Sequence, residues 1–188
     1  MARRSDTRDR TLRTAAELFS RQGYHGTGLN QVLAEGGLPK GSLYFHFPGG
    51  KEQLAAEAIE LSSAELCAWI ADALAEAEDG ASALTAIVEG LAAQLVASDY
   101  RTGCPIGTVA QDIGDTESVR AACAEAFARW HALLSDYLVR QGFSSQADTL
   151  ASTLLAAIQG AQLLARNCRD TAPLLAVGKT LAPLLRGH

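Results

Sequence analysis

Apolar residues recur every three or four positions along most of this chain, the spacing that places side chains on one face of an α-helix. In residues 7–22, Leu12, Ala15 and Phe19 follow this spacing, while arginines occupy the opposite face. Gly23 comes directly after this segment, as glycine often does at the end of a helix. The pattern therefore predicts a first helix over residues 7–22.

Two shorter helical segments follow the first. Thr27 stands in the position of an N-cap before the helix predicted over residues 29–35. Two glycines, residues 36–37, interrupt the chain, and a third helix is predicted over residues 39–46. Two short helices joined by a turn that contains glycine have the layout of a helix-turn-helix.

The helical segments become longer from about residue 50. Long helices are predicted over residues 51–78, 81–98, 116–141, 147–167 and 171–185. A break at residues 102–105 leads into a further short helix that reaches residue 113. No alternation typical of strands is long enough to predict a sheet. The pattern therefore predicts an all-α fold of about nine helices. An N-terminal helix-turn-helix domain is expected in residues 1–49, and a larger helical domain in residues 50–188.

The last two predicted helices, residues 147–167 and 171–185, carry leucines interspersed with alanine and glycine. Small residues allow helix backbones to approach closely, and a broad apolar arc needs a partner surface. Such a surface serves either as the core of one chain or as an interface between two subunits. Periodicity alone favours neither.

Composition and charge add to this picture. Of the 188 residues, 48% are apolar and only 6% aromatic, and the abundance of alanine and leucine favours packed helices. Residues 1–52 hold eight basic and five acidic residues, a net charge of +3; because the whole chain is −5, the remainder is −8. A basic N-terminal part on an acidic body indicates that the N-terminal part contacts a polyanion.

Several other classes of protein receive no support. No apolar run approaches the roughly 18 residues of a membrane span, and the first residues lack the apolar stretch of a secretion signal. We therefore expect a cytoplasmic protein with no membrane partner. The cysteines are far apart and form no Cys-x-x-Cys pair, which predicts free thiols and neither a metal site nor a cofactor. They are Cys67, Cys104, Cys123 and Cys168.

The glycines and lysines near residue 50 do not form a nucleotide site. A P-loop requires Ser or Thr directly after its Gly-Lys pair, whereas Glu52 follows Gly50 and Lys51 here. Cys104 and His131 could serve as a nucleophile and its base, but nothing in the sequence brings them together. We predict no catalytic residue and no enzyme.

The stretch around residues 39–51 instead fits a surface that reads DNA. Leu43 and Phe47, four residues apart, are expected to pack inward, so Tyr44, Phe45 and His46 cannot all do the same. Tyrosine and serine hydroxyls and lysine can contact phosphates, a phenyl ring fits a thymine methyl, and a glycine lets a helix end approach a phosphate. The predicted DNA-binding residues are Thr27, Lys40, Gly41, Ser42, Tyr44, Phe45, His46 and Lys51.

The residues that carry these features also resemble a known family. Over roughly residues 8–54, the stretch RTLRTAAELFSRQGYHGTGLNQVLAEGGLPKGSLYFHFPGGKEQL is similar to the TetR/AcrR family of transcriptional repressors, and GCPIGTVAQDI further on is similar to its LmrA/YxaF-like branch. Two positions depart from the family pattern. Pro39 stands where serine usually caps the recognition helix, and Phe45 replaces a residue that is commonly polar or a larger ring, so base preference is expected to differ.

The resemblance implies partners and a ligand site. It implies a double-stranded DNA operator, a homodimer formed by the two C-terminal helices, and a small-molecule inducer, which in this branch is aromatic or drug-like. It also implies that the middle helices enclose the inducer. The residues expected to line that pocket are Leu91, Leu95, Cys104, Val109, Gln111, Phe127, Trp130, His131, Leu134, Gln159 and Gln162.

These expectations combine into a repressor of a near-palindromic operator that dissociates when ligand binds the C-terminal domain. Its two recognition helices would lie about 34–36 Å apart, in successive major grooves, and residues 102–113 are the expected transmitter of the ligand signal. Two alternatives remain open at this point. One is a helical ligand-binding protein or enzyme whose basic N-terminal part has lost its operator, and the other is a helical adaptor for a protein partner.

Overall fold

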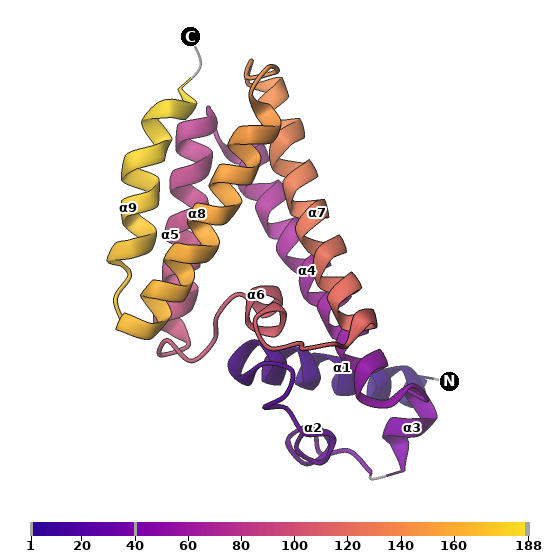
Figure 1. The fold of residues 1–188 in the computed structure, drawn as a ribbon. Helices are drawn as coiled ribbons and strands as arrows, with labels where there is room; N and C mark the ends of the chain where they lie inside the picture. The colour runs from indigo at the N-terminus through magenta and orange to yellow at the C-terminus, as the bar shows by residue number, and fades with distance from the viewer. Residues whose placement is uncertain (1, 40, 187–188) are drawn as a thin grey trace. The chain divides into compact units, whose positions relative to one another are not determined.

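The computed structural model describes residues 2–39 and 41–186, and the side chains within these ranges except those of residues 2–6 and 42. Within that part of the chain, all regular secondary structure is helical, with nine α-helices and one 3-10 helix (Figure 1). The helices are α1 (Ala2–Gln22), α2 (Leu29–Glu35), α3 (Ser42–His46), α4 (Gly50–Glu76), α5 (Gly80–Ala97), α6 (Pro105–Ala110), α7 (Glu117–Arg140), α8 (Ala147–Cys168), α9 (Ala172–Leu181) and η1 (Ala182–Leu185). The predicted all-α fold is confirmed.

Helix α1 begins at Ala2, before the predicted start at residue 7. Two other helices differ from the predicted spans for local reasons. Helix α3 begins at Ser42 and not at Pro39, and Gly41 is its N-cap. Gly41 is a weak helix former, which favours a start after it. The last predicted helix is divided into α9 and η1. Pro183 lies at the start of η1, where it removes a donor from the helical hydrogen-bond ladder, and its ring crowds the carbonyl four residues earlier.

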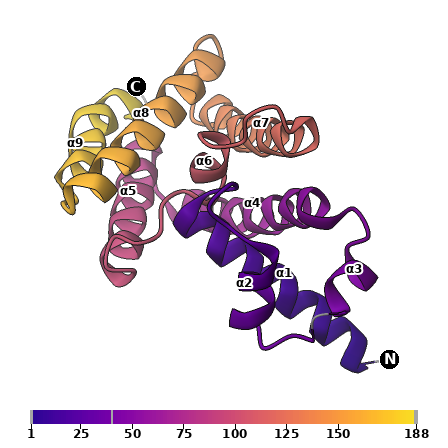
Figure 2. The same cartoon turned by 60° about the horizontal axis from the view of Figure 1, so that its bottom comes forward.

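The described chain forms two compact units. The first comprises Met1–Ala64 and Pro105–Ala126, and it therefore contains α1, α2, α3, α6 and the first parts of α4 and α7. Helix α1 packs against α2, α3 and α6 (Figure 2). The core of this unit includes fully buried side chains from most of these helices. They are Leu18, Phe19, Val32, Leu43, Phe47, Leu54 and Ile106.

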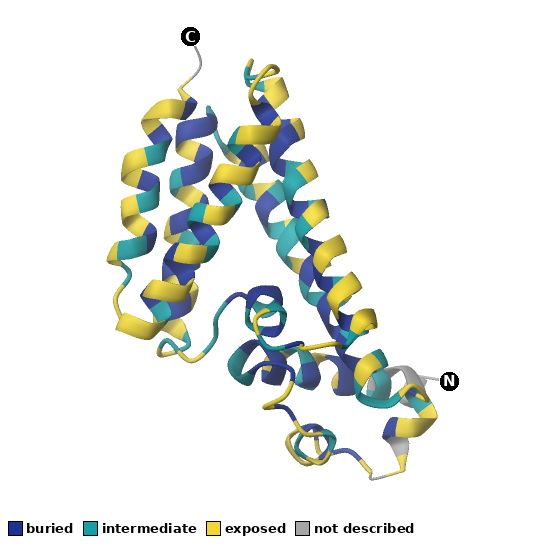
Figure 3. Cartoon of the chain, viewed as in Figure 1, coloured by how far each residue is buried: buried dark blue, intermediate teal, exposed yellow. Residues whose placement is uncertain are grey.

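The second unit comprises Glu65–Cys104 and Phe127–His188. Helix α5 packs against α8, α9 and η1, and α8 packs against α9, which agrees with the helices seen side by side in Figures 1 and 2. Their buried faces turn toward one another and their exposed faces outward (Figure 3). These two units divide the chain by packing, at positions other than residue 50. The predicted boundary between residues 49 and 50 remains a prediction.

Helix α5 shows how a central helix is built. Asp79 is its N-cap, and the Asp79 side chain accepts a hydrogen bond from the Ser82 N–H at 2.7 Å, while the Ser82 hydroxyl accepts one from the Asp79 N–H at 3.0 Å. This capping box satisfies donors that a helix start leaves unpaired. Contrary to the sequence expectation, α5 is long and apolar enough to cross a membrane by length and composition alone. Half of that segment is buried in the second unit, which accounts for its apolar character.

Candidate nucleic-acid interface

Helix α3 presents two exposed rings on a buried base. Leu43 and Phe47 are 1% and 0% exposed, which confirms that they pack inward, whereas Tyr44 and Phe45 are 64% and 63% exposed. The backbone forces this division, because side chains four residues apart share one face of a helix and the residues between them project elsewhere. Large rings held at a surface by two anchoring side chains can contact bases and sugars with little loss of conformational entropy on binding.

Neighbouring residues extend this exposed surface. His46 is half-buried, and its ring lies edge-on to that of Phe45, with 5.0 Å between the ring centroids. Gly41 immediately precedes α3, is exposed, and has open space where a Cβ atom would lie. A backbone without a side chain at this position can approach a phosphate closely. Lys40 and the Ser42 side chain lie outside the described residues, and their DNA contacts stay predictions.

Thr27 has a structural role that the sequence analysis missed. Its side chain is buried, and its hydroxyl donates a hydrogen bond to the Gly23 carbonyl at 2.7 Å. It is not the N-cap of α2, because Gly28 occupies that position without a side-chain cap. The prediction was wrong here because the hydroxyl reaches back to the end of α1. The DNA contact predicted for Thr27 stays a prediction, which the buried hydroxyl does not support.

Lys51 lies against a ring of its own chain. Its ammonium group is 4.5 Å from the centroid of the Tyr24 ring, a cation–π contact. Burial lowers the pKa of Lys51 from its ordinary value, and the nearby Asp112 carboxylate opposes that shift. The side chain is half-buried, so a phosphate contact by Lys51, which stays a prediction, would take place beside Tyr24.

Two arginines counted as part of the basic N-terminal segment also make internal contacts. Arg8 pairs with Glu57, and its guanidinium lies 5.2 Å from the centroid of the Phe47 ring. Arg10 donates a hydrogen bond to the Gly36 carbonyl at 2.6 Å. These contacts tie α1 to the start of α4 and to the turn of the helix-turn-helix. Part of the positive charge of this segment therefore fixes the positions of α1, α4 and the α2–α3 turn relative to one another.

The turn between α1 and α2 is held by the segment that follows α6. The His25 N–H donates a hydrogen bond to the Asp112 carboxylate at 2.7 Å. Burial raises the pKa of Tyr24, and the Glu52 carboxylate adds to this, while a hydrogen bond with Thr116 opposes it. The Ser118 hydroxyl, at the start of α7, donates to Glu52 at 3.1 Å. Sequence reasoning did not find these residues, because partners so far apart along the chain leave no periodic signal.

The residues predicted to line the ligand pocket fall in both units. Val109, buried, and Gln111, exposed, belong to the first unit. In the second unit six of the predicted residues are buried, Leu91, Leu95, Cys104, Trp130, Leu134 and Gln162, and three are half-buried, Phe127, His131 and Gln159. His131 bonds the surface of α8, with its Nε2 atom 3.1 Å from both the Asp148 carbonyl and the Ser152 hydroxyl. As a ligand-binding set these residues stay a prediction.

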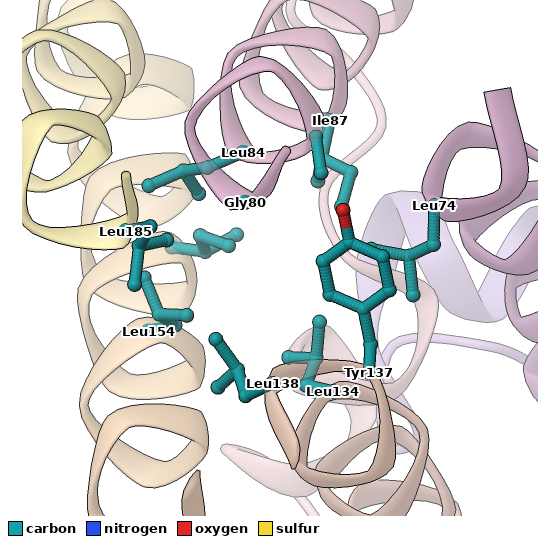
Figure 4. Close-up of a pocket in the computed structure, with 11 residues that line it drawn as sticks. Leu74, Gly80, Leu84, Ile87, Leu134, Tyr137, Leu138, Leu154 and Leu185 are labelled. Carbon is teal, nitrogen blue, oxygen red and sulfur yellow. The ribbon is translucent and has the colours of Figure 1, made fainter. Parts of the chain in front are cut away.

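The second unit contains a small pocket among apolar side chains (Figure 4). It lies between parts of α4, α5, α7, α8 and η1, and its cavity volume is about 20 Å³. Leu134 is the one residue of the predicted set that lines it. The other lining residues were not predicted as pocket residues, because pocket and core side chains have the same apolar character.

Comparison with known proteins identifies the two parts of the chain. Residues 12–58 match the model of bacterial regulatory proteins of the tetR family, and residues 80–180 match that of the C-terminal domain of LmrA/YxaF-like transcriptional regulators. The chain is 38% identical over 183 residues to the HTH-type transcriptional regulator LmrA of Bacillus subtilis, an alignment that covers 96% of this chain and 97% of LmrA. The chain belongs to the TetR family.

Solved structures of TetR regulators have the same fold. A TetR-family regulator from Agrobacterium tumefaciens superposes with a TM-score of 0.85 at 22% identity, over 97% of this chain and 99% of that one. The regulator CifR, solved as a cysteine mutant in complex with 26-bp operator DNA, superposes with a TM-score of 0.81 at 20% identity, over 94% and 95% of the two chains. At this low sequence identity, the structural similarity to these two proteins shows that the fold is shared.

Membership of the family establishes the general function. TetR regulators bind operator DNA and form dimers, and this chain is accordingly a DNA-binding transcriptional regulator and not an enzyme. The family implies a cytoplasmic or nucleoid location. The alternatives of an enzyme and of an adaptor for a protein partner are therefore set aside.

Proposed function

We propose that this TetR-family regulator is a repressor that binds a near-palindromic operator as a homodimer and dissociates when a small ligand binds its C-terminal part. The observation that carries the proposal is the pair of exposed rings on α3, Tyr44 and Phe45, above the buried anchors Leu43 and Phe47. A recognition helix in a major groove needs such a surface, and two copies about 34–36 Å apart would read successive grooves.

The distribution of exposed apolar side chains supports two contact surfaces. Among the described residues, eight large hydrophobic side chains are exposed. Two of them are the α3 rings, and four lie on the last helical elements. These four are Leu163, Leu164, Leu175 and Leu184. The proposal assigns the first surface to DNA and the second to a second copy of the chain, because exposed leucines on neighbouring helices favour a subunit interface.

DNA titrations test the first surface. Fluorescence anisotropy of the protein on the DNA upstream of its own gene, over a salt series, should give a log–log slope of about −0.9 for each phosphate neutralised. Tyr44→Ala should weaken operator binding by about tenfold, which corresponds to about 1.4 kcal/mol, and Tyr44→Phe isolates the contribution of the hydroxyl. Val96→Ala, at an exposed position on α5, is the matched control. Affinity that does not change with salt would refute operator binding.

Sedimentation tests the second surface. Leu164 is 57% exposed on α8, and Val139 is 46% exposed on α7. Leu164→Glu would place a charge in the proposed interface, so this variant should sediment as a monomer at a concentration where the unmodified protein is a dimer. Val139→Glu adds the same charge at an exposed apolar site outside the interface, and it should remain dimeric. Equal behaviour of the two variants would contradict a dimer through α8 and α9.

The contact between α6 and α1 supports residues 102–113 as the transmitter. Helix α6 packs against α1 within the first unit, and Asp112 holds the His25 N–H at the turn that leads into α2. A shift of this segment would therefore move the turn that orients the helix-turn-helix. Coupling of this kind in proteins is on the order of 1–3 kcal/mol. Asp112→Ala should change operator affinity in the absence of ligand, whereas an unchanged affinity would exclude Asp112 as the transmitting contact.

A further inference from the structure

Three non-glycine residues of the described chain have a left-handed backbone, and they lie together at the C-terminal ends of α5 and α8. Their φ angles are +53° for Asp99, +57° for Tyr100 and +53° for Arg169. All three belong to the second unit, in which α5 and α8 pack against each other. A residue with a side chain is disfavoured in this conformation and keeps it only where surrounding contacts hold it.

Other helices of this chain end in the same way with glycine. After α2 and α7, Gly37 and Gly142 have a positive φ, and the N–H of the next residue bonds to the carbonyl five residues before it. Glycine is the usual residue in this helix ending. Asp99 occupies the corresponding position after α5, where the Tyr100 N–H makes the equivalent bond at 2.7 Å, and Arg169 occupies it after α8. These two helix ends therefore use side chains where the chain elsewhere uses none.

The side chains at these two positions are bonded to each other. The Arg169 guanidinium forms an ion pair with the Asp99 carboxylate, donates to the Asp99 carbonyl at 3.3 Å, and lies 5.5 Å from the centroid of the Tyr100 ring. One turn earlier on α8, Arg166 donates to the Arg101 carbonyl at 3.0 Å. We call these contacts between residues 99–101 and the two arginines the α5–α8 clasp.

Local effects alone do not account for Asp99. A negative charge is unfavourable at the C-terminal end of a helix, and the left-handed backbone adds a second local cost. Arg169 offsets these costs only through a contact with another helix. The two side chains of the ion pair are 58% and 64% exposed, and an exposed pair shifts an equilibrium by at most about fivefold. The clasp is therefore weak enough to open reversibly.

The clasp lies directly before the proposed transmitter, residues 102–113. The Thr102 N–H donates to the Ser98 hydroxyl at 3.4 Å, residues 103–104 have no regular secondary structure, and α6 begins at Pro105. No helix separates the clasp from α6 along the chain, so a displacement of residues 99–101 passes along the backbone into α6.

We propose that the α5–α8 clasp is a regulatory device that holds the start of the transmitter, and that its opening lowers operator affinity. This inference rests on the proposed function, in which residues 102–113 pass the ligand signal to the helix-turn-helix. The loss of operator affinity cannot exceed the shift in the clasp equilibrium, which is about fivefold at most for an exposed ion pair.

Hydrogen–deuterium exchange of the full chain without DNA measures the opening of the clasp. Asp99→Asn and Arg169→Met each break the ion pair from one side, and asparagine tolerates the left-handed backbone. In both variants the amides of residues 99–102 and of residues 103–113 should exchange about three- to fivefold faster. Raising NaCl from about 0.05 M to about 0.5 M should accelerate exchange of the unmodified protein in the same segments and leave the variants unchanged, because salt screens exposed charges.

Two controls separate the clasp from general effects of charge. Arg120→Met breaks another exposed ion pair, with Glu117 at the start of α7, and it should not change exchange in residues 99–113. Asp99→Asn and Arg169→Met alter the net charge in opposite directions. Both should nevertheless weaken operator binding, by about three- to fivefold in fluorescence anisotropy, and the double variant should lose no more than either single variant.

The outcomes separate this inference from the proposed function. If the unmodified protein binds its operator and the two clasp variants bind it equally well, or with opposite changes in affinity, the regulatory device is refuted and repression stands. Faster exchange confined to residues 99–102 would likewise refute it, because the clasp would then be only a helix ending. If the unmodified protein does not bind its operator, the proposed function fails, and exchange in residues 103–113 alone decides whether the clasp holds this segment.

Discussion

Replacing Gly23 by alanine tests the contact between the α1–α2 turn and Asp112. Gly23 has a φ of +76°, a conformation that costs a residue with a side chain about 1–2 kcal/mol. Its new Cβ atom would lie 2.6 Å from the Asp112 Oδ2 atom, the same oxygen that accepts the His25 N–H at 2.7 Å. The carboxylate must move, and losing a hydrogen bond to a charged group at an exposed site costs about 1–1.5 kcal/mol. Gly23→Ala should therefore destabilise the protein by about 3 kcal/mol.

Gly37→Ala is the matched control. Gly37 also has a positive φ, +59°, but the nearest atom to a Cβ there is the flexible end of Arg10, at 3.4 Å. This variant should show the backbone cost alone, about 1–2 kcal/mol. The measurement is urea denaturation followed by circular dichroism, at one protein concentration for all variants because dimerisation shifts apparent stability.

A double-mutant cycle decides whether Asp112 is the cause. In an Asp112→Ala background the carboxylate is gone, so adding Gly23→Ala should cost only the backbone term that Gly37→Ala reports. Two results would refute the reasoning. One is equal destabilisation by Gly23→Ala and Gly37→Ala, and the other is the same cost of Gly23→Ala with and without the Asp112 carboxylate.

Two further predictions concern a buried tyrosine and a close helix contact. Burial holds the pKa of Tyr24 above its ordinary value of 10.0. The stability that this shift contributes is therefore complete below about pH 10 and is lost as pH rises through the folded-state pKa. The Tyr24→Phe variant should lose less stability above pH 10, and an equal fall in the free energy of unfolding with pH for both proteins, measured by urea titration, would contradict this. At Gly90 of α5 a Cβ atom would lie 2.4 Å from the Trp69 ring. Alanine at this position gains about 1 kcal/mol of helix propensity, but displacing the indole of Trp69 costs about 1–3 kcal/mol. Gly90→Ala should therefore lower the urea midpoint of unfolding and change the tryptophan fluorescence. A raised midpoint would show that the indole moves freely.

The helices could be predicted from the sequence because their signals are local. Periodicity, end glycines and prolines act within a few residues, so α2 was predicted over its observed span and Leu43 and Phe47 were correctly expected to face inward. The division of α9 from η1 has an equally local cause in Pro183, and the Asp79 cap with its Ser82 partner is likewise visible in the sequence. The sequence analysis missed both the end of α9 and the Asp79 cap, although the residues that indicate them are present in the sequence.

The positions of individual site residues could not be predicted in this way. Thr27 and Lys51 have residue types suited to phosphate contacts, yet Thr27 is bonded to the Gly23 carbonyl and Lys51 lies over the Tyr24 ring. Whether a polar side chain faces solvent depends on what packs beside it, and the chain near residue 25 meets Asp112 only after folding. The small apolar pocket of the second unit has the same origin, since helices distant in sequence line it.

Amino-acid order alone was therefore sufficient for the all-helical class, the helix-turn-helix and the exposed rings of α3, because each depends on side chains within one or two helical turns of one another. The Asp112 contact, the inward orientation of Thr27 and the small apolar pocket were decided only by the tertiary structure. Contacts between segments far apart in the chain have no period, and an apolar side chain that lines a cavity has the same chemistry as one that fills a core.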